Sequence, residues 1–203
     1  MHPGLPFAHL NLRRNPFGEQ DREAWVQTAV LDVDPLVAWL REPGSAVQLV
    51  AAPGRGKTTC LLALDAALPE ATYARAWTES VPARRRAILL LDEADAIWFF
   101  TRWPLLLTAR SVAVAVHRDF SRELRLLGFR VHTKRPGGLD AERLHTIVTR
   151  RVEAVRRGPG PVPRVPHESL HALIAEHGDD LRAVRVALYA AFQRLETVRD
   201  VDL

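Results

Sequence analysis

The sequence predicts an α/β fold, in which a five-stranded parallel sheet lies between helices and a small all-helical part follows. Short apolar runs of strand length alternate with helical segments as far as residue 132, which is typical of a doubly wound parallel sheet. One of these runs, residues 87–91, is apolar throughout, as expected for a strand covered on both faces. Beyond Gly137-Gly138 only helical patterns remain.

Each element follows from its local pattern. Strands are expected at residues 46–51, 71–76, 87–91, 112–116 and 129–132, and helices at 23–30, 34–42, 57–68, 103–109, 121–127, 139–157, 167–177 and 180–198. Asp34 is expected to be the N-cap of its helix, with Pro35 at the first helical position. The chain then divides into an N-terminal arm and helix (1–44), a core (45–136) and a helical part (137–203).

Composition limits the class of protein. The chain has 203 residues, of which 47% are hydrophobic, enough to bury a core, and no apolar run approaches the roughly 20 residues of a membrane helix. The start of the chain lacks the layout of a signal peptide, and the single cysteine, Cys60, excludes a disulfide within the chain. We therefore expect a cytoplasmic protein without a membrane partner. The net charge of +4 and the pI of about 9.9 suit an anionic partner, such as a nucleotide, a nucleic acid or an acidic protein surface.

A phosphate-binding loop follows the first strand. Residues 51–58 read Ala-Ala-Pro-Gly-Arg-Gly-Lys-Thr and match the P-loop pattern, with alanine at its first position. Glycines allow the backbone N–H groups to point at phosphates, and the helix that follows directs its positive end to the same place. Lys57 is expected to reach the β- and γ-phosphates and the Thr58 hydroxyl to bind Mg²⁺. The residues expected to bind nucleotide here are Pro53, Gly54, Arg55, Gly56, Lys57, Thr58 and Thr59.

Two carboxylates follow the apolar run at 88–91. Asp92 and Glu93 stand where the strand ends, and in open α/β sheets ligands bind at the carboxyl ends of the strands. We expect Asp92 to hold Mg²⁺ opposite Thr58 and Glu93 to act as the general base for an attacking water. Asp95 is interpreted as a helix cap or a surface residue.

The P-loop and the Asp-Glu pair together resemble the P-loop ATPases that carry an extra strand and a catalytic glutamate, in particular the AAA+ ATPases. The resemblance covers residues 45–195 and is specific at the two motifs. It implies that His117, after the strand at 112–116, senses the γ-phosphate, although histidine is unusual there. It also implies that Arg182, in the segment Asp179-Asp180-Leu181-Arg182, contacts the γ-phosphate from a helical lid formed by residues 137–203.

The resemblance further implies an oligomer, in which a neighbouring subunit supplies an arginine finger. No single arginine stands out for that role, and the candidates are Arg118, Arg122, Arg150 and Arg151. Compact relatives of this kind include transposition regulators and ATPases similar to replication initiators, which act on DNA. The implied function is an ATPase in a DNA-linked process, with ATP and Mg²⁺ as cofactors and Lys57 and Glu93 as catalytic residues.

Two other functions remain open. The chain could be an ATP-dependent switch or scaffold that hydrolyses little and recruits a protein partner, or a kinase for a small molecule. The helical C-terminal part fits an ATPase lid better than a kinase lid. The Asn-Lys-x-Asp motif that reads guanine is absent, which favours ATP over GTP.

One aromatic segment remains. Trp98-Phe99-Phe100, with Trp103, follows the acidic pair. If exposed it forms a partner surface, and if packed it is ordinary core, which is the interpretation we favour.

Overall fold

The computed structural model describes residues 6–19, 21–76 and 86–202. It forms two compact units. One unit comprises residues 31–137, and the other comprises residues 1–30 together with 138–203. Residues 1–44, grouped together in the sequence, are thus divided between the two units. No helix among the described residues is both long and apolar enough to span a membrane.

The unit of residues 31–137 contains a five-stranded sheet whose paired strands are all parallel, as the sequence predicts. The strand order is β2-β3-β4-β1-β5. The strands are β1 (Ser45–Val50), β2 (Ala71–Arg75), β3 (Arg86–Asp92), β4 (Ala109–Val116) and β5 (Arg130–Lys134). Because β4 separates β1 from β3, the sheet has the additional strand that the resemblance implies.

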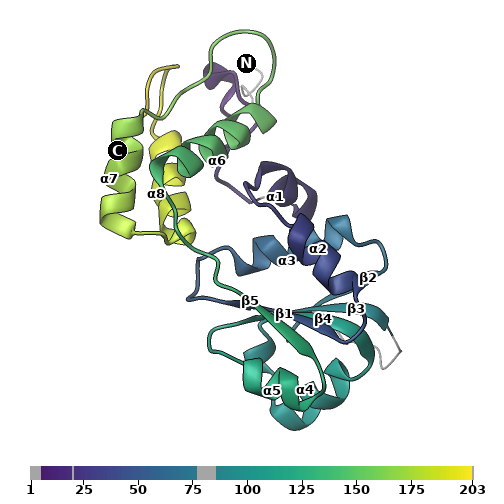
Figure 1. Cartoon of the computed structure of the whole chain (residues 1–203). Coiled ribbons are helices and arrows are strands. Elements are labelled where there is room, and N and C mark those ends of the chain that lie inside the picture. The colour runs from purple at the N-terminus through teal and green to yellow at the C-terminus, as the bar shows by residue number, and fades with distance from the viewer. Residues whose placement is uncertain (1–5, 20, 77–85, 203) are drawn as a thin grey trace. The chain divides into compact units, whose positions relative to one another are not determined.

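Helices cover both faces of this sheet (Figure 1). On one face α2 (Asp34–Arg41) and α3 (Lys57–Ala67) pack on side chains such as Val47, Leu49 and Leu90. On the other face, α4 (Phe99–Leu106) and α5 (Ser121–Leu126) pack on the strand side chains that point the opposite way, such as Leu89 and Val114. Since successive side chains of a strand point to opposite faces, a sheet covered in this way needs continuous apolar strands.

One buried polar side chain interrupts β1. Gln48 is fully buried, and its Nε2 donates to Asp119 Oδ1 at 2.9 Å and to Thr133 Oγ1 at 2.7 Å. Its Oε1 accepts from the backbone N–H of Phe120 at 2.8 Å. Hydrogen bonds from Gln48 and then Ser121 lower the pKa of Asp119 to about 2. Gln48 therefore connects β1 to the segment after β4 and to β5.

The N-cap of α2 and the start of α4 are not those that the sequence indicates. The N-cap of α2 is Val33, and Asp34 is already helical with Pro35 in the first turn. The Asp34 amide is bound instead by the Asp32 carboxylate at 3.1 Å. Helix α4 begins at Phe99 rather than at residue 103, and Pro104 lies inside it, where its missing N–H removes one backbone hydrogen bond of the helix.

The aromatic segment at the start of α4 is exposed, so the expectation of a packed core there is wrong. Trp98 and Phe100 have 69% and 70% of their surface exposed. The face that α4 buries carries Arg102 and Leu106, which are one turn apart. Three consecutive aromatic residues cannot all share that face of a helix.

Arg102 is buried because its guanidinium is fully bonded. Nε and Nη2 form a bidentate pair with the Glu123 carboxylate at 2.8 Å each. Nη1 donates to the carbonyls of Ala94 and Ile97, and the group lies 4.4 Å from the Phe120 ring centroid. This pair joins α4 to α5 beneath the sheet.

Arg102→Met is therefore expected to lower the free energy of unfolding by about 3 kcal/mol, since removing one partner leaves a part-buried carboxylate unpaired. Urea unfolding followed by circular dichroism measures the change. Arg125→Met, at an exposed position on α5, is the control and should stay within about 0.5 kcal/mol of the parent. Equal midpoints for the two variants would show that the pair does not stabilise the unit.

The other unit is helical. It contains α1 (Arg22–Thr28), α6 (Ala141–Ala154), α7 (His167–His177) and α8 (Leu181–Gln193), with a short 3₁₀ turn at Ala8–Leu10. Its α7 has the expected bounds, whereas α6 and α8 end earlier than expected, at Ala154 and Gln193. The apolar faces of α6, α7 and α8 form its core.

The N-terminal arm belongs to this helical core. Leu10 and Leu12 are fully buried, and Phe17 is 2% exposed and lies edge-on to Phe192. The buried Asn15 side chain donates to the Tyr189 carbonyl at 3.0 Å and accepts from the Phe17 amide at 2.9 Å. An arm rich in proline is thus ordered by burial and side-chain hydrogen bonds, together with a short antiparallel β-bridge between Leu12 and Arg156.

Candidate nucleotide-binding site

The loop between β1 and α3 has the backbone that a P-loop needs. Gly54 and Gly56 adopt positive φ values of 80° and 82°, a conformation that glycine adopts without steric cost. Gly56 is the N-cap of α3, and its carbonyl accepts the first helical bond from the Cys60 amide. The loop thus leads directly into a helix N-terminus, where free N–H groups and the helix dipole favour anions. Pro53, Gly54, Arg55 and Gly56 lie in the loop, and Thr58 and Thr59 lie in the first turn of α3.

Lys57 is the first residue of α3. Its side chain is buried, and Nζ donates to the carbonyls of Ala51 and Ala52 at 2.6 and 2.9 Å. These carbonyls begin the same loop, so the ammonium group is held beside the backbone that would surround a phosphate. A buried ammonium needs such partners, and the same three donors suit a triphosphate.

Thr58 and Asp92 come together, although they are far apart in the chain. The Thr58 hydroxyl donates to Asp92 Oδ2 at 2.9 Å, and the Asp92 carboxylate is 1% exposed. Tyr73, on β2, donates its hydroxyl to the same oxygen at 3.1 Å. The P-loop helix and the acidic end of β3 therefore meet at one point.

Glu93 has an unusual backbone and an ion pair. Its φ of 55° lies in the left-handed region, a conformation that residues other than glycine seldom adopt. Residues with such strained backbones are found more often at functional sites. Its Oε1 lies 2.6 Å from Arg75 Nη2, with both side chains partly exposed. The hydrogen bond to Glu93 raises the pKa of Arg75.

His117 follows β4 and therefore lies at the same edge of the sheet as the P-loop and Asp92. Its backbone N–H and its Nδ1 both lie within hydrogen-bond distance of Asp95 Oδ2, at 3.0 and 2.7 Å. Burial raises the pKa of Asp95, but the hydrogen bonds from His117 outweigh that effect and leave it lowered. The sequence indicates a helix cap or a surface residue at Asp95, but its carboxylate instead binds the backbone and the ring of His117.

Arg182 belongs to the helical unit. It is exposed in the first turn of α8, whose N-cap Asp180 accepts from the Arg182 and Ala183 amides. Among the arginine-finger candidates, Arg118 and Arg122 are exposed, as a finger must be. Arg150 donates to the Ala29 carbonyl, and Arg151 is only 6% exposed.

Tyr73 and Arg75 are site residues that the sequence analysis missed. Both lie on β2, which pairs with β3 so that Arg75 is the ladder partner of Asp92. Residues two apart on a strand share a face, which places both near the acidic pair. The signal in the sequence was two long polar side chains near the end of an expected strand, but it has meaning only once β2 is known to adjoin β3.

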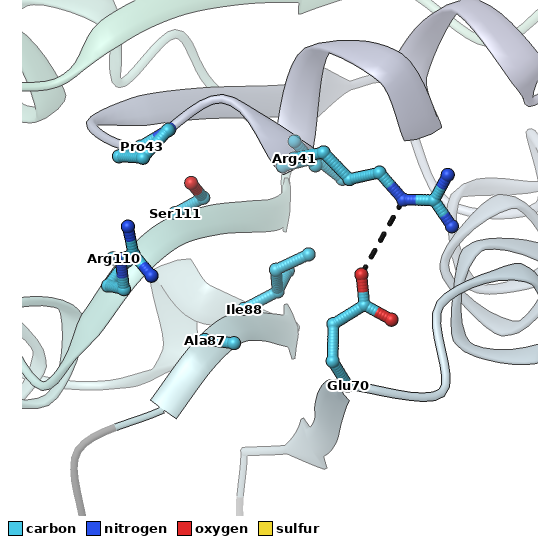
Figure 2. Close-up of a pocket in the computed structure, with 8 residues that line it drawn as sticks. Arg41, Pro43, Glu70, Ala87, Ile88, Arg110 and Ser111 are labelled. Atoms are coloured by element: carbon cyan, nitrogen blue, oxygen red, sulfur yellow. Dashed lines mark ion pairs between the residues drawn. The ribbon is translucent and has the colours of Figure 1, made fainter.

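A separate pocket of about 220 Å³ lies at the opposite edge of the sheet (Figure 2). It is lined near the starts of β3 and β4 by residues such as Ile88 and Ser111, with an ion pair of 3.6 Å between Arg41 and Glu70 at its side. None of the residues expected to bind nucleotide lines it.

The chemistry of the P-loop edge fits magnesium and a triphosphate. A hydroxyl and a carboxylate are the hard oxygen donors that Mg²⁺ prefers, and this ion commonly takes one or two protein ligands together with phosphate oxygens. Among the described residues no group of three or more His, Cys, Asp or Glu side chains could hold a metal alone. Cys60, one turn into α3, is no ligand candidate because burial raises its pKa to about 11.

Comparison with solved structures supports the fold. A DNA replication initiation factor aligns with a TM-score of 0.56 and 15% identity over 86% of this chain and 66% of that one. Cdc6p from Pyrobaculum aerophilum aligns at 0.53 and 17% over 88% of this chain and 68% of that one. The replication initiator DnaA, bound to AMPPCP and single-stranded DNA, aligns at 0.53 and 14% over 80% of this chain and 59% of that one.

The resemblance to AAA+ P-loop ATPases is thus confirmed at the level of the fold. This chain spans only about three fifths to two thirds of the lengths of those structures. No protein-family model and no curated protein sequence matches this chain.

Proposed function

We propose that this chain binds ATP with Mg²⁺ at the P-loop and hydrolyses it, as an oligomeric ATPase in a DNA-linked process. The observation that carries the proposal is the 2.9 Å contact between Thr58 Oγ1 and Asp92 Oδ2. It joins a helix N-terminus preceded by positive-φ glycines to a buried carboxylate, with a second carboxylate next in the chain. Phosphoryl transfer to water needs this combination of phosphate cradle, metal ligands and base.

Each residue then has a role. Lys57 and the loop amides of residues 53–59 bind the phosphates, and Lys57 offsets the charge that develops on the transferred phosphoryl group. Thr58 and Asp92 would hold Mg²⁺, which supplies charge stabilisation and orients the phosphates when bound. Glu93 accepts a proton from the attacking water. His117, positioned by Asp95, and Arg182 of the helical unit are the proposed γ-phosphate contacts.

The oligomer and the link to DNA are inferred from the fold, the net charge and two exposed arginines. The fold is similar to that of replication initiators, one of which was solved with single-stranded DNA. The net charge of +4 suits a nucleic acid. Arg118 and Arg122 are exposed at the same end of the sheet as His117, after β4, and are the preferred candidates for a finger in trans.

The test is phosphate release from ATP and Mg²⁺ over a range of protein concentrations, with and without double-stranded DNA. Specific activity that rises with protein concentration supports the oligomeric ATPase, and stimulation by DNA supports the DNA-linked role. Failure to bind ATP would refute the proposal as a whole.

One observation favours a second function, an ATP-dependent switch or scaffold with little hydrolysis. The 2.6 Å ion pair with Arg75 occupies the carboxylate of Glu93, which must be free to accept a proton from water. Flat, near-zero release despite measurable ATP binding would select this function. In that case the partner is a protein recruited by the ATP-bound form.

Arg75→Ala separates these two roles of Glu93. We expect its turnover to rise by up to about fivefold, because an exposed ion pair contributes at most about 1 kcal/mol. The measurement is steady-state phosphate release at saturating ATP. Arg41→Ala removes a comparable exposed pair, with Glu70 at the opposite edge of the sheet, and should leave the rate unchanged. A fall in turnover of Arg75→Ala would show instead that Arg75 assists the reaction.

A further inference from the structure

The helical unit contains a buried arginine that has no carboxylate partner among the described residues. Arg151, on α6, is 6% exposed, and its Nε has no hydrogen-bond partner within the described part of the chain. Burial first and the nearby Arg185 second lower the pKa of Arg151 to about 10. No carboxylate contributes to that shift. A charged group in this position is costly unless something pairs with it.

Aromatic rings and a second cation surround Arg151. Its guanidinium carbon lies 4.6 Å from the Trp25 ring centroid and 6.0 Å from that of Phe17. The guanidinium of Arg185, on α8, lies 6.0 Å from the same Trp25 ring. We call Trp25, Arg151 and Arg185 the arginine–tryptophan cluster. The ring faces stabilise the cations in part, but they supply no hydrogen-bond acceptor in the plane of either guanidinium.

The acidic side chains on the same helices do not supply the missing charge. Glu23 of α1 accepts from Gln27, and Glu153 of α6 is paired with Arg156 at 2.6 Å. Glu142 is exposed in the first turn of α6, nine residues before Arg151. Helix α8 has no acidic residue between Leu181 and Gln193. Arg102 shows the contrast, because that buried guanidinium has both a bidentate carboxylate and two carbonyl partners. Within the described part of the chain, the cluster has two cations and no carboxylate to pair with them.

We propose that the arginine–tryptophan cluster is a binding site for a phosphate group, separate from the P-loop. Guanidinium groups pair with phosphate through two parallel N–H donors, and two such groups suit a doubly charged anion. Because Arg151 is almost fully buried, only a small anion or the terminal phosphate of a small molecule can reach it. The backbone of a nucleic-acid duplex is too broad to reach a guanidinium that is buried to this extent. The inference does not depend on the proposed ATPase function.

The test is isothermal titration of the full chain with inorganic phosphate in one arm and with AMP in the other. A Lys57→Ala background removes a key P-loop contact, so that saturable binding which persists there reports the cluster. Tighter binding of inorganic phosphate identifies a free anion as the ligand, and tighter binding of AMP identifies a phosphate monoester. The thermal midpoint should rise with the bound ligand in parallel.

Arg185→Gln is expected to weaken the binding by about tenfold or more, since a hydrogen bond to a charged group is lost. Arg194→Gln, on the C-cap of the same helix with Nε bonded to the Ala190 carbonyl, removes the same charge and should leave the affinity unchanged. Arg151→Met should abolish the response to phosphate while the ligand-free thermal midpoint stays the same or rises, because an unpaired buried charge is removed.

Three results would overturn the proposal. These are the absence of saturable binding by phosphate and AMP alike, equal affinities for Arg185→Gln and Arg194→Gln, and a rise in thermal midpoint that sodium chloride reproduces at the same ionic strength. If Arg151→Met is strongly destabilised, the comparison of Arg185→Gln with Arg194→Gln decides whether the cluster binds phosphate.

Discussion

Glu93→Gln is expected to lower the rate of ATP hydrolysis by about 10²–10⁴-fold, the usual contribution of a general base, while ATP still binds. The amide keeps the size of the side chain and its hydrogen bond to Arg75, but it cannot accept a proton from water. Because Lys57, Thr58 and Asp92 are untouched, the dissociation constant for ATP should change by less than about threefold. Phosphate release at saturating ATP, together with titration of a fluorescent ATP analogue, measures both quantities.

The matched control is Glu70→Gln. Glu70 also forms an exposed ion pair with an arginine, but at the opposite edge of the sheet, and its neutralisation should not alter turnover. Unchanged turnover in Glu93→Gln would show that the base is assigned wrongly, and Asp95 would become the next carboxylate to examine. A loss of ATP binding in Glu93→Gln would instead indicate that the carboxylate serves the structure of the site.

Lys57→Ala is expected to weaken ATP binding by about 10- to 100-fold, since hydrogen bonds from a charged group contribute about 1.5–3 kcal/mol. The two carbonyls that Lys57 now contacts border a loop in contact with solvent, so water can replace the ammonium without unfolding α3. Isothermal titration with a non-hydrolysable ATP analogue gives the affinity, and circular dichroism confirms that the fold is retained.

Lys134→Ala is the control for that change. Its Nζ donates to the Asp32 carbonyl at 3.1 Å, which makes it a lysine bonded to backbone like Lys57 but at the end of β5. It should bind the analogue with the parent affinity. If both variants bind equally well, the P-loop assignment fails and the loop is a glycine turn with a structural lysine.

The sequence predicts well what depends on local pattern. The strands, the P-loop and the acidic pair lie within short segments, and hydrophobic periodicity with turn chemistry is enough to place them. The contact between Thr58 and Asp92 could be anticipated, since both follow strands at the carboxyl edge of one parallel sheet. The roles of these residues remain predictions for the experiments above.

What the sequence could not predict depends on long-range neighbours. Tyr73 and Arg75 matter because β2 adjoins β3, and no local pattern gives strand order. Arg102 is buried and the aromatic residues before it are exposed, since the face of α4 is decided by Glu123 on another helix. No local pattern shows that Arg151 is buried, because its neighbour Trp25 lies more than a hundred residues earlier in the chain.

The left-handed backbone at Glu93 has a consequence for how this protein can be altered. A residue other than glycine in that conformation costs on the order of 1 kcal/mol, and glycine would relieve it. Glu93→Gly is therefore a change that should benefit folding while removing the carboxylate that we propose as the general base. A library selected only for thermal resistance should accumulate this substitution, whereas selection for turnover should reject it. At this position, selection for stability and selection for catalysis favour different residues.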